Sequence, residues 1–239
     1  VSFNTPFQDD VNFIDFVWTQ SNQSLPSILR NLFMVDNNHM AVIPKLELAI
    51  QYWLFQDINF QRIIFISALQ IVAVAALLFR VLRKQQVAYW KAIPIFFCWF
   101  QPQYFEISNW AMTGSQQSSV LLFSLLSLNF IEKPGTKNVL IATLFAGMAF
   151  FSFGSGVFAY IGIGYYLLAN RRFREILWVI PLPILQLIAY LYMSKLGSVM
   201  NTQAIHIEDA LAFFLNLLGT ISMVIQWHPA QLAWGLGSL

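Results

Sequence analysis

Long apolar runs separated by short polar turns dominate the chain from residue 61 onward. The clearest run covers 63–82, and about 20 apolar residues at 1.5 Å per residue are enough to cross the ~30 Å hydrocarbon core of a bilayer. Similar runs predict transmembrane helices near 63–82, 88–101, 116–131, 138–152, 157–169, 176–193 and 210–226. The pattern therefore predicts an all-α, multi-spanning transmembrane protein.

The segment 138–170 has no charged residue. As one helix it would be about 50 Å long, which is too long for a single crossing without strong tilt. The small residues of Phe153-Gly154-Ser155-Gly156 lie in its middle, and basic residues flank both of its ends. We therefore expect a hairpin of two short spans that breaks at these glycines.

Residues 1–60 are the longest polar region, and they precede a transmembrane helical domain at 61–239. Pro44 is predicted to be the first residue of a helix that runs to about Phe55. A helix of this length is too short to span a bilayer, and its end is rich in aromatic residues. We therefore expect an external loop region with an interfacial helix that lies along the membrane surface.

The composition supports the same class of protein. Hydrophobic residues make up 58% of the 239 residues and charged residues only 10%, and the mean hydropathy is +0.61. Soluble domains carry about 25% charged residues, so the balance excludes an ordinary soluble domain, a disordered chain and a nucleic-acid binder. The single cysteine, Cys98, excludes an intrachain disulfide.

Positive charge gathers in three turns, near 80–91, 132–137 and 171–175. These turns hold nine of the 13 basic residues and only two of the 11 acids, Glu132 and Glu175. By the positive-inside rule they face the cytoplasm. Residues 1–60 and the loops near 101–115 and 194–209 then share the external face.

An acidic pair, Asp9-Asp10, lies between aromatic residues in the first external segment. A carboxylate held at the membrane surface can act as a general base on a hydroxyl nucleophile. The alternative is a solvated turn or a helix N-cap, where aspartate is favoured. Spacing alone favours this alternative.

Two further groups on the external side are candidates for substrate binding. His39 and Lys45 precede and begin the interfacial helix and are suited to phosphate, although a plain polar loop gives the same pattern. Gln103, Glu106 and Trp110 form the second group, for which a membrane-interface turn is the alternative. No spacing typical of a metal site occurs. The sequence therefore assigns no cofactor, and a bound divalent cation is the one alternative.

The order of these motifs resembles the GT-C superfamily of membrane glycosyltransferases, most closely the bacterial type that uses polyprenyl-phosphate sugars. Asp9-Asp10 occupies the place of the loop-one catalytic acid. Asn37-Asn38-His39-Met40 followed by Pro44-Lys45-Leu46 resembles the N-E-H-R and P-R-L segments of the family. Residues 100–110, with the pattern F-x-P-Q-x-x-E-x-x-x-W, resemble its second external motif. The first span of the family would precede Val1, so we expect the chain to be a fragment of a larger GT-C-like fold.

The resemblance implies an enzyme of the cell envelope in the bacterial inner membrane, with its active site facing outward. It implies inverting transfer of a sugar from a polyprenyl-phosphate-linked donor to a glycan or lipid-linked acceptor, with Asp9 or Asp10 as general base. The expected partners are these substrates and membrane lipids, without nucleic acid. A lipid or solute transporter or flippase and a non-catalytic membrane scaffold subunit are the alternatives, although nearly all charges lie outside the predicted spans.

Overall fold

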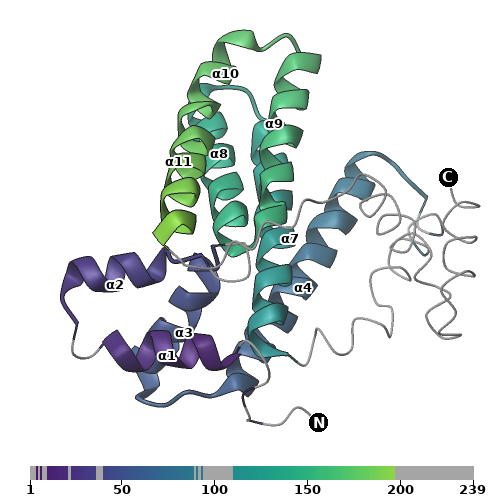
Figure 1. Cartoon of the computed structure of the whole chain (residues 1–239). Coiled ribbons are helices and arrows are strands. Elements are labelled where there is room, and N and C mark those ends of the chain that lie inside the picture. Colours follow the sequence, from purple (N-terminus) through teal and green to yellow (C-terminus); the bar gives the residue numbers. More distant parts are fainter. Residues whose placement is uncertain are drawn as a thin grey trace, which may run out of the picture. The chain divides into compact units, whose positions relative to one another are not determined.

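A computed structural model of the protein (Figure 1) describes residues 4, 6, 10–20, 23–35, 40–88, 90, 93 and 110–196. The side chains at 19, 20, 195 and 196 are excepted. Every regular element within these ranges is helical, which confirms the all-α prediction for this part of the chain. The predicted spans near 88–101 and 210–226 lie outside the described residues, apart from a few positions of the first.

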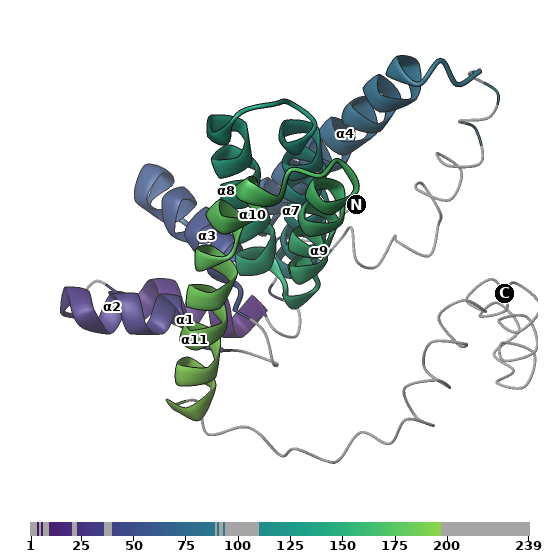
Figure 2. The ribbon, with the colours of Figure 1, turned by 90° about the horizontal axis from the view of Figure 1, so that it is seen from above.

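Four long helices form the main bundle. They are α4 (Phe60–Lys84), α7 (Ala111–Ile131), α8 (Thr136–Ser152) and α9 (Val157–Ala169). Helix α7 packs against the other three, as the view along the bundle shows (Figure 2). Close approach is possible because the buried faces of α7 and α8 carry small side chains. These are Ala111, Gly114, Ser115, Ser118, Ser119, Ala142, Ala146 and Ala149.

The predicted glycine break is confirmed. Helix α8 ends at Ser152, a 3₁₀ turn occupies Gly154–Gly156, and α9 begins at Val157. Gly156 is buried where the two helices meet. A Cβ atom at this position would lie 2.1 Å from the backbone carbonyl carbon of Ala149, so only glycine fits.

The predicted span at 176–193 consists of two consecutive helices, α10 (Phe173–Val179) and α11 (Pro181–Leu196). Pro181 has no N–H to donate and its ring interferes with a preceding carbonyl, which explains the break at Ile180. Helix α10 contacts α8 and α9, and α11 contacts α8. Gln186 of α11 links α8 and α9 through buried hydrogen bonds. It accepts one from the Tyr160 hydroxyl of α9 (2.7 Å) and donates one to the Gly147 carbonyl of α8 (3.1 Å).

The described part of the N-terminal region contains three helices, although only one was predicted. They are α1 (Asp10–Gln20), α2 (Leu25–Leu32) and α3 (Val42–Phe55). The prediction that Pro44 begins the third helix is wrong, because α3 begins two residues earlier. Proline is tolerated there because the N–H groups of the first turn have no helical acceptor in any case.

Helix α3 carries its polar side chains toward the protein. Lys45 and Gln51 are buried, whereas Ile50, Trp53 and Leu54 are exposed. The buried face also carries Val42, Pro44 and Leu48, so it mixes polar and apolar side chains. An apolar exposed face is unusual in a water-soluble domain. The arrangement is compatible with the predicted interfacial helix.

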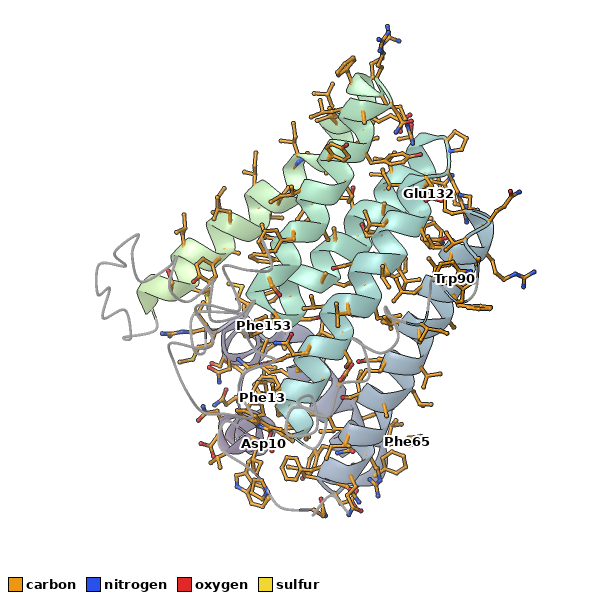
Figure 3. All side chains as sticks on the ribbon, turned by 90° about the vertical axis from the view of Figure 1, so that its right-hand side faces the viewer. Asp10, Phe13, Phe65, Trp90, Glu132 and Phe153 are labelled. Carbon is orange, nitrogen blue, oxygen red and sulfur yellow. The ribbon has the colours of Figure 1, made fainter. Side chains whose placement is uncertain are left out.

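The three basic turns lie at one end of the bundle. Lys84 at the end of α4 forms an ion pair with Glu132, which follows α7. The Arg172 guanidinium donates to the Ile131 carbonyl (2.7 Å). Helices α1 and α3 lie at the opposite end, where α7 begins; Figure 3 shows Asp10 and Glu132 at the two ends. The predicted grouping of the turns is thus confirmed for these residues.

Two helical stretches of the described chain are long and apolar enough to span a membrane, Phe60–Lys84 and Phe173–Ser194. The first contains the predicted span at 63–82. Helices α8 and α9 are apolar but shorter. Large apolar side chains, such as Phe65 (Figure 3), project from α4 on the side away from the bundle.

Candidate functional site

Asp10 is the first residue of α1 and is 1% exposed. Its Oδ1 atom accepts a hydrogen bond from the backbone N–H of Met112 (3.1 Å), in the first turn of α7. The N-terminus of a helix carries partial positive charge, so an acidic side chain is favourably placed there. The neighbouring Asp9 lies outside the described residues. Asp10 thus caps a helix N-terminus, but the capped helix is α7 and not its own helix α1. The donor, Met112, lies 102 residues further along the chain.

Lys45 lies on α3 and is 3% exposed. Its Nζ atom donates to the carbonyls of Asn31 (3.1 Å) and Met34 (3.2 Å), at the C-terminal end of α2. The rings of Phe13 and Phe16 lie 6.0 Å and 5.7 Å from the same atom. A cation at a helix C-terminus is favourable because the last carbonyls carry partial negative charge. These contacts link α3 with α2 and α1.

Trp110 is the residue that precedes α7, and its carbonyl accepts the N–H of Gly114 (2.8 Å). The start of α7 therefore brings together two of the expected site residues, Asp10 and Trp110. Lys45 lies near this pair, because its Nζ atom is 6.0 Å from the ring of Phe13, which follows Asp10 by one turn of α1. His39, Gln103 and Glu106 lie outside the described residues.

A polar cluster that the sequence analysis did not identify lies between α3, α4 and α7. We call it the Glu47 cluster, and it consists of Glu47, Gln70, Ser115, Ser118 and Ser119. Glu47 accepts hydrogen bonds from the Gln70 amide (2.8 Å) and from the Ser115 hydroxyl. The Gln70 carbonyl oxygen accepts from Ser118, and it lies 3.2 Å from the Ser119 hydroxyl.

Burial raises the pKa of Glu47 above 4.5, and the hydrogen bonds from Ser115, Gln70 and Ser119 partly offset this effect. No basic side chain contacts Glu47 in the described part of the chain. Glu47 and Gln51 were visible in the sequence as interruptions of an apolar helix. The contacts of Glu47 with α4 and α7 were not visible in the sequence, because these contacts depend on how α3 packs against the two helices.

An apolar groove of about 680 Å³ lies between α2, the end of α8 and α11. Arg30 and Tyr192 supply polar atoms at its wall, and Phe33, Phe151 and Leu185 are among its apolar lining residues. Arg30 is exposed and forms no ion pair or hydrogen bond with any described residue. The groove follows α11 from Leu182 to Met193, about 16 Å at 1.5 Å per residue.

Arg62, in the first turn of α4, has contacts of its own. Its guanidinium forms a two-point ion pair with Asp57 (2.6 Å and 3.2 Å) and lies 4.2 Å from the centre of the Phe55 ring. Within the described residues, no group of three or more histidine, cysteine, aspartate or glutamate side chains lies close enough to hold a metal ion.

The described helices thus define a helical protein with two membrane-length apolar stretches, a buried carboxylate at the start of α7 and an apolar groove beside α2. No family model, curated protein or solved structure matches the chain. A functional assignment therefore depends on the chemistry of the residues alone.

Proposed function

We propose that the chain is a multi-spanning membrane glycosyltransferase of the GT-C type that transfers a sugar from a polyprenyl-phosphate donor to an acceptor on the external face. The donor combines a long apolar tail with an anionic phosphate. A protein that binds it needs an apolar groove with a cation at the rim, at the level of the lipid headgroups.

Exposed apolar side chains support a membrane location for more helices than those of the two membrane-length stretches. Helix α9 exposes Phe158, Ile161 and Tyr165, and α11 is exposed over much of its circumference. A soluble monomer rarely exposes contiguous apolar patches of this kind. We therefore place α7, α8 and α9 in the membrane with α4 and α11, and the basic turns on the cytoplasmic side.

The groove between α2 and α11 is the observation that carries the proposal. Its lining is mainly apolar and suits an isoprenoid tail, and the Arg30 guanidinium is available for a phosphate. It also borders the expected catalytic region. Phe33 and Met193 of its wall belong to the same apolar cluster as Phe13, which follows Asp10 by one turn of α1.

Asp10 or its neighbour Asp9 would then serve as general base. The backbone N–H of Met112 holds the Asp10 carboxyl at the start of α7, and a carboxylate there would accept a proton from the acceptor hydroxyl. That oxygen would attack the anomeric carbon while the lipid phosphate leaves, with inversion. A positioned base contributes about 10²–10⁴ in rate.

The test uses the purified chain in nanodiscs with a radiolabelled polyprenyl-phosphate sugar and a fluorescent polyprenyl phosphate. We expect Arg30→Gln to weaken lipid binding about tenfold, the loss of roughly one charge-assisted contact. Arg174→Gln, at an exposed position of the basic end, is the matched control and should bind normally. Equal lipid affinity in both variants would contradict the assignment of the groove.

Asp9→Asn and Asp10→Asn, singly and together, test the chemical step. We expect the double variant to bind the donor lipid normally and to lose transfer. Asp15→Asn, also on α1 but exposed, is the control for the loss of a carboxylate from this helix. Retained transfer by a folded double variant would remove the general-base assignment.

A transporter is a second candidate, and the Glu47 cluster favours it. Transporters place ionisable groups between helices, and Glu47 contacts side chains of α4 and α7. Counterflow of a labelled lipid or solute into vesicles without sugar transfer would support this alternative. The absence of both activities would favour the scaffold role for residues 1–60.

A further inference from the structure

We propose that the Glu47 cluster binds a single monovalent cation, Na⁺, between α3, α4 and α7. The proposal goes beyond sugar transfer and uses none of the residues assigned to it. It depends on the charge of the cluster, on the type and spacing of its oxygen atoms, and on a neighbouring amide without a partner.

The cluster has one carboxylate, and no basic group of the described residues neutralises it. Helix α7 contains no ionisable residue at all. On α4, the basic residues nearest to Gln70 in sequence are Arg62 and Arg80, about 12 Å and 15 Å away along the helix axis.

The charged residues on the other helices that pack against α3 are also engaged or distant. Lys45 of α3 itself donates to carbonyls of α2, and Asp10 of α1 accepts from the start of α7. Asp15 and Arg30 are exposed, and Lys137 begins α8 at the end of the bundle that carries the basic turns. Partial burial removes water from the Glu47 carboxylate, which is costly without a counter-charge. One bound positive charge would remove this cost, whereas a divalent ion would leave an excess positive charge.

All atoms that the cluster offers to a cation are oxygens. They are the two carboxylate oxygens of Glu47, the carbonyl oxygen of Gln70 and the three serine hydroxyls. Hard cations bind such ligands in preference to nitrogen or sulfur. The Ser118 hydroxyl lies 2.7 Å from the Gly114 carbonyl, so it can turn its proton to the helix backbone and present a lone pair to an ion.

Two of the separations between these oxygens suit an ion of the size of Na⁺. The Ser119 hydroxyl lies 3.4 Å from Glu47 Oε1 and 3.2 Å from Gln70 Oε1. Na⁺ is nearly as large as Ca²⁺, for which ligand distances are about 2.3–2.6 Å, and two ligands at right angles are then about 3.4 Å apart. Mg²⁺, with ligands at about 2.0–2.1 Å, would require a tighter set.

Gln51 provides the independent observation. It follows Glu47 by one turn on the same face of α3 and is 4% exposed. Neither its Oε1 nor its Nε2 atom has a hydrogen-bond partner among the residues that the structure describes, although buried amides almost always have one. A bound ion, or a water molecule that the ion holds, would supply the missing partner.

The experiment measures ²²Na⁺ binding to the purified full chain in nanodiscs, with choline replacing Na⁺ at constant ionic strength. We expect saturable binding of one ion per chain, displaced by unlabelled Na⁺ but not by equal K⁺. Because Na⁺ and a proton compete for Glu47, the apparent affinity should fall about tenfold per pH unit at pH values below the pKa of Glu47. Na⁺ should also raise the unfolding temperature.

Glu47→Gln should abolish both binding and the thermal shift, whereas the matched control Glu132→Gln, at the opposite end of the bundle, should retain both. If Glu47→Gln does not fold, Ser119→Ala keeps the carboxylate and should weaken binding severalfold. A folded wild-type chain without saturable binding at ~0.15 M salt, or unchanged binding in a folded Glu47→Gln variant, would overturn the proposal. No sugar donor is present, so failure here is distinct from failure of the glycosyltransferase proposal.

Discussion

The turn between α8 and α9 gives the sharpest test of the fold, through the change Gly156→Ala. The added Cβ would lie 2.1 Å and 2.2 Å from the carbonyl carbon and oxygen of Ala149 and 2.3 Å from the backbone nitrogen of Phe150. All three are backbone atoms, so no side-chain rotation relieves the overlap. Overpacking typically costs about 1–3 kcal/mol, and we expect the upper end, about 3 kcal/mol.

For a domain of this size that loss lowers the unfolding temperature by roughly 6–12 °C. The assay is thermal unfolding of the purified chain in detergent, followed by circular dichroism. Gly164→Ala is the control on α9, because a Cβ there meets nothing within 4 Å. It should leave the stability unchanged or raise it by up to about 1 kcal/mol. Equal unfolding temperatures for the two variants would refute the tight turn at Gly156.

Three further variants test the interior contacts and the charge of the Glu47 carboxyl. Tyr160→Phe leaves the Gln186 carbonyl oxygen without its donor and should cost about 1–3 kcal/mol, while Tyr165→Phe, at an exposed position, should be neutral in the same unfolding assay. Arg172→Ala removes the donor to the last carbonyls of α7 and should lower the unfolding temperature by about 2–8 °C. Burial raises the pKa of Glu47 in the folded state, so the stability of the wild-type chain in Na⁺-free buffer should decline as pH rises from 4.5 through the folded pKa. Glu47→Gln should lack this decline. Parallel pH profiles of stability for the two chains would contradict the raised pKa of Glu47.

Much of the bundle was predictable because its signals are local. The run at 63–82 lies within α4, and Gly154 and Gly156 lie in the predicted break between α8 and α9. The basic turns also lie together as the charge pattern indicated. In each of these cases, hydrophobicity or backbone freedom within a few residues decides the structure.

The polar interior was not predictable, because it depends on contacts between distant segments. Glu47 was not among the predicted site residues, and only the packing of α3 against α4 and α7 brings it to Gln70 and Ser115. Helices α1 and α2 were missed for a similar reason. Their apolar residues gain stability from a shared core with α3, rather than from a long periodic pattern.

The bond between Asp10 and Met112 has a consequence for biosynthesis. The two residues are 102 positions apart, and a ribosome adds about 5–20 residues per second. Helix α1 therefore emerges about 5–20 s before the backbone group that its carboxylate binds. During this interval Phe13 and Phe16 have no partner from α7, and a chaperone or the translocation machinery has time to act on the nascent chain.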